Sequence, residues 1–535
     1  MTTPTTPTPS AWAPLGNRVF AMLWIATVIS NVGTWMNDVG AGWLMTTLDP
    51  SPATVALVQA ATTLPVFLFA LPAGALADII DRRRLLLTVV LLQTVVATIL
   101  AAVVWADAMT VELLLLFTFL LGSGAAFLAP AWQAIVPGLV PRDQLGAAVS
   151  LNSVGVNVSR AIGPALGGAL IVSVGLYAPF FANAISFIGV IAALWLWRGE
   201  TKREGALPPE HVLPAMGAGL RYARRSPDLQ RTILRAVTFF VFAAAFWAML
   251  PLIARNVLEG GAPLYGILLG CVGAGAVGGA ALLPLLRARL GPDEVVMVGG
   301  LGTAASMVGF ALAPAPWAAV PAALLAGASW IASLSSFQVS AQASLPNWVR
   351  ARGLSLFLTA FFGAMTGGAI LWGLVAEAVG VAPTLLIAAA ALAVTAVLTR
   401  TIRLTKGGVD RSPSLHWPAP PPVPPLAGDA GPVMVTVDYK VTADQRETFH
   451  ALINDLRTSR LRDGGYNWRL MQPLEEQDIV REVFFTASWL DHLRQHERVT
   501  DAEAKLQEAI RQTVNAPPYV QHYLPARVEF EKADK

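Results

Sequence analysis

The sequence predicts an all-α polytopic membrane protein with twelve transmembrane helices in two six-helix bundles, followed by a C-terminal α+β soluble domain. Three observations support this prediction. Of the 535 residues, 55% are hydrophobic and only 13% are charged, whereas a soluble protein carries about 25% charged residues. Twelve apolar stretches reach the ~20 residues that a helix needs to cross a bilayer. After residue 405, polar residues and prolines become frequent.

The twelve predicted spans form two sets of six. A polar segment, 198–232, separates an N-terminal bundle, 15–197, from a C-terminal bundle, 233–405. Residues 1–14 are rich in threonine and proline and are expected to form a disordered tail. The predicted spans are 19–47, 53–77, 84–106, 111–136, 147–175, 178–197, 233–254, 264–286, 294–313, 316–341, 354–377 and 382–400.

The basic residues predict the orientation. With the N-terminus in the cytoplasm, the outer loops hold only Arg255. The inner loops hold Arg18, Arg82–Arg84, Arg142, Arg198, Lys202, Arg203, Arg221, Arg224, Arg225, Arg231, Arg235, Arg287, Arg289, Arg350, Arg352, Arg400 and Arg403. This asymmetry follows the positive-inside rule. We expect a multi-pass protein of the bacterial inner membrane with both termini cytoplasmic. The net charge of +3 is therefore a sign of membrane orientation and does not indicate nucleic-acid binding.

Two short segments are candidates for gating. In the loop after the second span, Gly74 and Asp78 precede Arg82 and Arg83. In the fifth span, small residues and a proline recur at Gly163, Pro164, Gly167 and Gly168. Glycines at this spacing let helices approach closely in lipid, and the eighth span carries a similar stripe. The stripes indicate either simple helix packing or a rocking interface between the two bundles.

These segments resemble signatures of the major facilitator superfamily. The stretch 74–84 is similar to the superfamily's first signature, and 163–168 to the core of the signature associated with antiporters. Segments 72–78 and 130–133 resemble the enterobactin-exporter-like branch, also called transmembrane secretion effectors. Ile79 stands where a basic residue is usual, and Asp81 where many members carry glycine. The resemblance covers roughly residues 15–405.

The resemblance implies the major facilitator fold and transport by alternating access. It also implies that Asp78 meets the N-terminal dipole of the eleventh helix near Leu354. Such a contact is worth about 0.3–1 kcal/mol when exposed and up to ~2 kcal/mol when partly buried. A carboxylate that only enforces topology is the alternative.

Asp38 and Arg160 are the two formal charges predicted to lie well inside the spans. Each costs at least ~2.5–3.5 kcal/mol there unless it is paired or hydrated. Their depths are similar, so a permanent salt bridge and a proton or substrate site both remain open. Polar and aromatic residues at comparable depth could line an amphipathic cavity, although interhelical hydrogen bonds and interfacial anchoring are alternatives. These are Asn31, Asn37, Gln59, Gln93, Asn152, Asn157, Gln338, Gln342, Trp35, Trp247 and Trp330.

The segment 433–527, which follows a proline-rich linker at 406–432, is expected to be a ferredoxin-like domain with the element order βαββαβ. Its segments 459–468 and 488–498 resemble the cytoplasmic tail of some secretion-effector transporters, a fold similar to the antibiotic-biosynthesis monooxygenases. His492 and His496 lie four residues apart, but two histidines without a third ligand do not define a metal site. Substrate sensing and dimerisation both remain open as functions of this tail.

The sequence as a whole predicts a proton-driven exporter of a small amphipathic metabolite, such as a siderophore, antibiotic or drug. Its expected partners are the lipid bilayer, protons and the small-molecule substrate. No ATP-binding P-loop sequence is present, and no cofactor, metal, nucleic acid or catalytic residue is expected. A membrane-anchored enzyme or sensor acting through the tail is the alternative, as is an importer of the same fold.

Overall fold

The computed structural model describes residues 10, 12–197, 212–346, 348–405 and 430–525. Most of the predicted N-terminal tail and proline-rich linker lies outside these residues. Twelve described helices are long and apolar enough to cross a membrane, which confirms the predicted number. They are α1 (Arg18–Leu48), α2 (Pro52–Ile79), α3 (Arg82–Trp105), α4 (Val111–Leu139), α5 (Leu145–Ser173), α6 (Ala178–Leu196), α8 (Pro227–Leu252), α9 (Ala262–Arg289), α10 (Pro292–Leu312), α11 (Ala319–Ala343), α12 (Arg350–Val379) and α13 (Val381–Leu398).

One helix was not predicted. The segment 198–232, expected to be a polar loop, contains the helix α7 (Val212–Arg224), and α8 begins at Pro227 rather than near residue 233. The helix α7 is amphipathic: Ala218 and Tyr222 are buried, whereas Arg221 and Arg224 are exposed. Its thirteen residues are too few to cross a bilayer. The average polarity of the segment concealed this helical periodicity.

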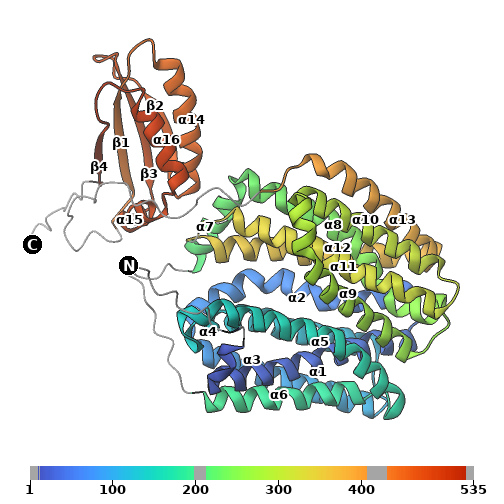
Figure 1. Ribbon diagram of the computed structural model, residues 1–535. Coiled ribbons are helices and arrows are strands. Elements are labelled where there is room, and N and C mark those ends of the chain that lie inside the picture. The colour runs from blue at the N-terminus through green and yellow to red at the C-terminus, as the bar shows by residue number, and fades with distance from the viewer. Residues whose placement is uncertain (1–9, 11, 198–211, 347, 406–429, 526–535) are drawn as a thin grey trace, which may run out of the picture. The chain divides into compact units, whose positions relative to one another are not determined.

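The chain divides into two compact units. The first contains Met1–Val212, Arg231–Ser340 and Ser355–Leu404, and the second contains Leu213–Gln230, Ala341–Leu354 and Thr405–Lys535. In the first unit α1 packs against α5 and α6, α2 against α4, and α10 against α13. The helices α5 and α9 pack against each other and connect the two six-helix bundles (Figure 1).

The loop between α2 and α3 is held by its own polar residues. The carboxylate of Asp81 accepts a hydrogen bond of 2.8 Å from the backbone N–H of Arg84 and so caps the N-terminus of α3. The guanidinium of Arg83 donates to the carbonyl oxygens of Leu194 and Trp195, both at 2.9 Å, at the C-terminal end of α6. A cation at this end also complements the helix dipole. Asp81, one of the two departures from the signature, therefore has a structural role.

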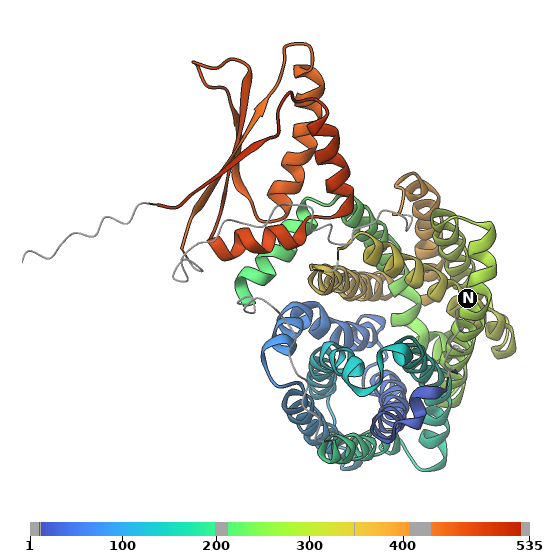
Figure 2. The ribbon, with the colours of Figure 1, turned by 60° about the vertical axis from the view of Figure 1, so that its left-hand side comes forward.

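The C-terminal part of the second unit confirms the predicted βαββαβ order. Its elements are β1 (Val433–Lys440), α14 (Arg446–Arg462), β2 (Tyr466–Met471), β3 (Ile479–Thr486), α15 (Trp489–Arg498), α16 (Asp501–Arg511) and β4 (Tyr519–Tyr523). The sheet is antiparallel, with strand order β2-β3-β1-β4. The helices α14 and α16 cover one face of it (Figure 2). Val435, Phe449, Ile453 and Phe484 form part of the buried core.

Candidate functional site

A small cavity lies between the two bundles of the first unit. Its volume is about 60 Å³, which is enough for a few water molecules but too small for a metabolite. Asp38, Gln59 and Tyr265 give it polar groups, and Trp35 and Trp247 give it aromatic walls. The full lining is Trp35, Asp38, Ala41, Gly42, Val55, Val58, Gln59, Thr62, Trp247, Ala248, Leu250, Pro251, Tyr265 and Leu269, from α1, α2, α8 and α9.

Asp38 and Arg160 do not form a salt bridge. The guanidinium carbon of Arg160, on α5, lies 5.3 Å from the ring centroid of Trp35. Trp35 and Asp38 are three residues apart on α1, so they share one side of the helix. A cation over an indole ring gains about 0.5–2 kcal/mol, which offsets part of the cost of a charge in the membrane. Arg160 is thus held beside the cavity by an aromatic ring, and Asp38 faces the cavity as a separate carboxylate.

Most other predicted substrate residues lie elsewhere. Gln93 is buried, and its amide donates to the carbonyl of Leu121 at 3.0 Å, so it connects α3 to α4. The amide of Asn157 donates at 2.8 Å to a carbonyl of its own helix. Asn31 is half-buried and Gln338 is exposed, and neither lines the cavity. Of Asp38, Arg160, Asn31, Gln93, Asn157 and Gln338, only Asp38 lines the cavity.

Tyr265 was not predicted as a site residue. It is the only one of the seven tyrosines that lies inside a predicted span. A single polar aromatic residue within an apolar span is the sequence feature that could have identified it as a site residue. Its hydroxyl is close to α1, because a Cβ atom on Gly42 would lie 2.8 Å from it. Glycine at position 42 therefore makes room for the tyrosine beside Asp38.

Trp247 connects the cavity to an aromatic cluster in the C-terminal bundle. Its ring centroid lies 5.3 Å from that of Trp330, which in turn lies 5.2 Å from Phe240 and 6.3 Å from Phe361. Trp330, predicted to line the cavity, instead stands behind Trp247. The indole N–H of Trp247 is buried without a hydrogen-bond partner among the described residues. Because Trp247 also lines the cavity, this N–H is a candidate donor for a bound molecule.

The small residues of α5 allow close contacts with two helices. A Cβ atom on Gly163 would lie 2.6 Å from Cβ of Trp35, and one on Gly167 would lie 3.0 Å from Cα of Met36, both on α1. On the other side, a Cβ on Gly168 would lie 3.0 Å from the carbonyl oxygen of Ala262 on α9. The stripe thus sits where the N-terminal bundle touches the C-terminal one. Its gating role stays a prediction.

The helices α2 and α12 form a second contact between the bundles. The hydroxyls of Thr63 and Thr366 lie 2.8 Å apart at its middle. Near the predicted outer end, the hydroxyl of Ser51 donates to the Glu377 carboxylate at 2.7 Å. At the opposite end, a Cβ on Gly74 would lie 3.4 Å from the hydroxyl of Ser355. These contacts join the two bundles along the length of α2 and α12.

The side chain of Asp78 lies outside the part of the chain that the structure describes. Its backbone belongs to the last turn of α2, which ends at Ile79. Gly74, one turn earlier, approaches the first residues of α12. The predicted contact of Asp78 with the start of that helix is therefore still a prediction. Arg82 begins α3.

The C-terminal domain contains a buried polar network. The carboxylate of Glu482 is fully buried and accepts hydrogen bonds from Arg460 at 3.1 Å, Trp468 at 2.8 Å and Tyr439 at 3.0 Å. Burial raises the pKa of Tyr439, and the neighbouring Glu482 carboxylate raises it further. Three donors compensate the buried charge. This arrangement is typical of a structural network rather than of a carboxylate poised for chemistry.

The predicted histidine pair belongs to a triplet. The Nε2 atoms of His492 and His496 lie 3.2 Å apart, and the ring of His522 is 4.6 Å from that of His492. Among the described residues, no group of three or more His, Cys, Asp or Glu side chains has an arrangement that could hold a metal ion. Burial, followed by the adjacent His522 and His496, lowers the pKa of His492 to about 3. We therefore interpret these rings as core packing.

His492 should make the stability of this domain depend on pH. The folded state keeps His492 neutral down to about pH 3, whereas the unfolded chain protonates it below its ordinary pKa of 6.5. The unfolded state thus binds more protons between these values, and this residue lowers the free energy of unfolding by up to about 1.4 kcal/mol per pH unit as pH falls. In His492→Gln this contribution is expected to disappear. Hydrogen exchange of the β1 and β3 amides, compared at neutral and mildly acidic pH in both proteins, measures it.

Comparing wild type with His492→Gln separates the contribution of His492 to the pH dependence from the contributions of other titrating groups. Asp463 also titrates in this range, because burial raises its pKa to about 6, but it does so in both proteins. An identical pH dependence in wild type and variant would contradict this role of His492.

Residues 9–529 match the family described as Transmembrane secretion effector. This chain belongs to that family. Two solved structures share the fold of this chain. The peptide transporter POT has a TM-score of 0.61 at 13% identity, and the match covers 74% of this chain and 96% of that one. The nucleoside transporter NupG has a TM-score of 0.60 at 15% identity, and the match covers 72% of this chain and 99% of that one. The major facilitator fold is thereby confirmed.

Curated relatives of this chain include transporters. The staphyloferrin A transporter of Staphylococcus aureus is 25% identical over 264 residues, which are 49% of this chain and 65% of that protein. The multidrug efflux pump Tap of Mycobacterium tuberculosis is 27% identical over 210 residues, 38% of this chain and 50% of that protein. The matches thus span between half and two thirds of these relatives. The chain therefore has the major facilitator fold and is similar to membrane transporters.

Proposed function

We propose that this secretion effector exports a small amphipathic metabolite by alternating access, driven by the proton gradient. The observation that carries the proposal is the Asp38 carboxylate, which lines a small cavity between the two bundles. No salt bridge is formed by this carboxylate with any described residue. A carboxylate that can change its protonation state in such a place can couple proton movement to a conformational change.

The walls of the cavity support an amphipathic substrate with an aromatic or extended apolar part. Trp35 and Trp247 provide flat apolar surfaces, and Tyr265 and Gln59 provide groups that can hydrogen-bond. Arg160, over Trp35, adds a positive charge at the edge, which suits a substrate that bears an anionic group. Siderophores, antibiotics and drugs of this kind fit these features.

The cavity is too small for such a substrate in this conformation. We therefore interpret the structure as a closed state in which the space of about 60 Å³ holds only water. Separation of α5 from α9, or of α2 from α12, would enlarge it. The glycines at these contacts let the helices meet closely, so that the same surfaces can part as rigid bodies.

The direction of transport and the cytoplasmic position of both termini are also part of this proposal. The basic residues of the predicted inner loops support the orientation. The related efflux pump supports export, and the related siderophore transporter supports the substrate class. An importer of the same fold would move its substrate in the same direction as the protons, whereas the proposed exporter moves it in the opposite direction.

We further propose that the C-terminal domain is accessory rather than catalytic. Its buried carboxylate, Glu482, already accepts hydrogen bonds from Arg460, Trp468 and Tyr439. Its histidine rings pack against one another and against Trp489 in the core. A role in dimerisation or regulation fits such a domain better than a reaction does.

Flux measurements on the purified full-length protein in proteoliposomes test the proposed function. A panel of siderophores, antibiotics and dyes is offered under an imposed pH gradient, with a protonophore as the control. At least one amphipathic compound is expected to move against its concentration gradient only while the pH gradient lasts. Movement of every transported compound at the same rate after the gradient is collapsed would contradict proton drive.

A further inference from the structure

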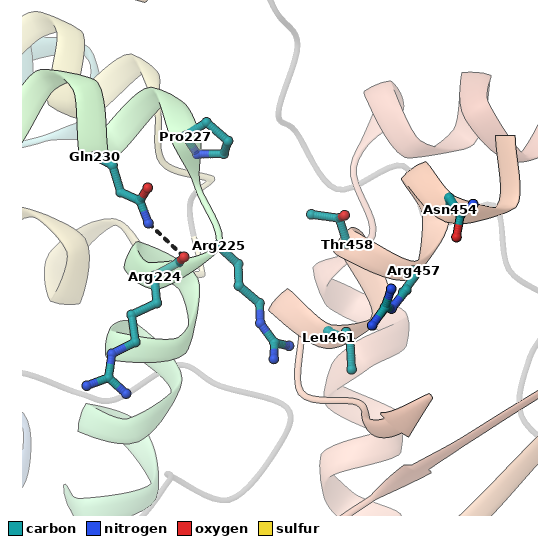
Figure 3. A pocket seen from close by; sticks show the side chains of 8 residues that line it. All are labelled: Arg224, Arg225, Pro227, Gln230, Asn454, Arg457, Thr458 and Leu461. Atoms are coloured by element: carbon teal, nitrogen blue, oxygen red, sulfur yellow. Dashed lines mark hydrogen bonds between the residues drawn. The ribbon is translucent and has the colours of Figure 1, made fainter. Parts of the chain in front are cut away.

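A second, larger pocket lies within the second compact unit. Its volume is about 430 Å³, which is in the range of small-molecule sites. One wall is the turn between α7 and α8, and the other is α14 (Figure 3). The lining residues are Arg224, Arg225, Pro227, Gln230, Asn454, Arg457, Thr458 and Leu461.

The pocket is lined by three arginines and no carboxylate, and the side chain of Arg224 points away from the opposite wall (Figure 3). Arg225 and Arg457 extend toward each other from opposite walls (Figure 3). None of Arg224, Arg225 and Arg457 forms an ion pair with a described residue, and the nearest acids in sequence, Asp228 and Asp455, do not line the pocket. Like charges that face one another repel, so an anion between them would stabilise the arrangement.

Both walls are held in place by contacts close to the pocket. The amide of Gln230 donates to the carbonyl oxygens of Ala223 at 3.1 Å and Arg224 at 2.7 Å, which braces the α7–α8 turn. The guanidinium of Arg457 lies 5.5 Å from the ring centroid of Trp468. The two walls meet where Arg462 lies over the ring of Tyr222 at 5.2 Å.

We propose that this pocket binds a phosphate-bearing anion with at least two negative charges. The planar fork of arginine pairs with phosphate through two parallel hydrogen bonds, and the hydroxyl of Thr458 and the amide of Asn454 supply further donors. Pro227 and Leu461 offer apolar contact to an organic part. The anion is either a soluble phosphorylated metabolite or the headgroup of an anionic lipid, since both present the same chemistry.

Occupation of the pocket would link the C-terminal domain to the transport machinery. Arg225 lies two residues before the start of α8, and α8 carries Trp247 to the cavity wall. An anion shared by Arg225 and Arg457 holds α14 on the α7–α8 turn. The site is therefore a means by which a cytoplasmic or lipid signal reaches the seventh transmembrane helix.

The test uses the full-length protein in nanodiscs and follows hydrogen exchange of α7 and α14. One arm adds inorganic pyrophosphate to nanodiscs of phosphatidylcholine, and the other replaces part of the phosphatidylcholine with phosphatidylglycerol. The double variant Arg225→Gln, Arg457→Gln removes two guanidinium groups and should weaken the response about 100-fold, since each charged hydrogen-bonding contact contributes roughly tenfold. The variant Arg469→Gln, at an exposed position outside the pocket, should respond like wild type.

Protection by pyrophosphate alone supports a soluble anion, protection by phosphatidylglycerol alone supports a lipid headgroup, and protection by both supports a site open to either. The variant Arg225→Lys, Arg457→Lys keeps the charges and should respond more strongly than the glutamine pair, which separates binding from loss of folding. Absence of protection in both arms, or equal protection in wild type and the glutamine pair, would overturn the proposal.

Discussion

Replacing Asp38 with asparagine is expected to reduce pH-gradient-driven export to the level of empty liposomes. The amide has nearly the shape of the carboxylate but cannot carry a proton at physiological pH. If Asp38 is the proton carrier, its loss removes the coupling, whereas exchange of substrate down its own gradient should persist. Flux in proteoliposomes, measured with and without an imposed pH gradient, distinguishes the two activities.

The Asp38→Asn variant should still insert and fold. A charged residue within a span costs at least ~2.5–3.5 kcal/mol on insertion scales, so its removal should not destabilise the protein. The matched control is Asp107→Asn, the same chemical change at an exposed loop position. Asp107 has a backbone φ of 52°, which asparagine adopts readily. Unchanged pH-driven flux in Asp38→Asn would exclude this carboxylate as the carrier.

The second large effect is expected at the α5–α9 contact. A Cβ atom on Gly266 would lie 2.6 Å from the carbonyl oxygen of Pro164 and 3.2 Å from Cα of Gly168. Both are backbone atoms, so Gly266→Ala must push the two bundles apart. Overpacking of this kind costs about 1–3 kcal/mol. We expect a lower thermal midpoint and a large loss of transport, because the closed state is destabilised.

Gly278, on the same helix, provides the matched control. No described atom outside its own stretch of helix lies within 4 Å of the position that its Cβ would take. Gly278→Ala should therefore preserve transport, and it should leave stability unchanged or raise it by up to ~1 kcal/mol through helix propensity. Equal behaviour of the two alanine variants in both measurements would show that the close contact at Gly266 is not important for either property.

The sequence was sufficient to predict the helices and strands that are recognised by their average polarity or by a simple periodicity. Each transmembrane helix must satisfy its own backbone hydrogen bonds in lipid, so its length and apolar composition suffice to locate it. Strand β3 alternates buried and half-buried residues, and β1 alternates buried and less buried residues except at the buried Thr436. This alternation made the strands of the C-terminal domain predictable. By contrast, α7 needed its amphipathic spacing to be recognised within a polar segment.

The candidate site was less predictable, because it depends on which face of each helix meets which neighbour. Depth alone placed Asp38 and Arg160 together, but the rotation of α1 and α5 puts the ring of Trp35 under the guanidinium. Gln93 is at a similar depth, yet it faces α4. Tyr265 joins the site from the other half of the chain, at a contact that no local pattern encodes.

Proton movement caused by the substrate itself tests the central claim most directly. Proteoliposomes containing the full-length protein and a trapped pH indicator, with no initial pH gradient, are given a gradient of a transported compound from the flux panel. Coupled export predicts that protons move opposite to the substrate, with a fixed ratio between the two initial rates, and that Asp38→Asn removes the proton movement. Substrate movement at a normal rate without any change of internal pH would contradict the account.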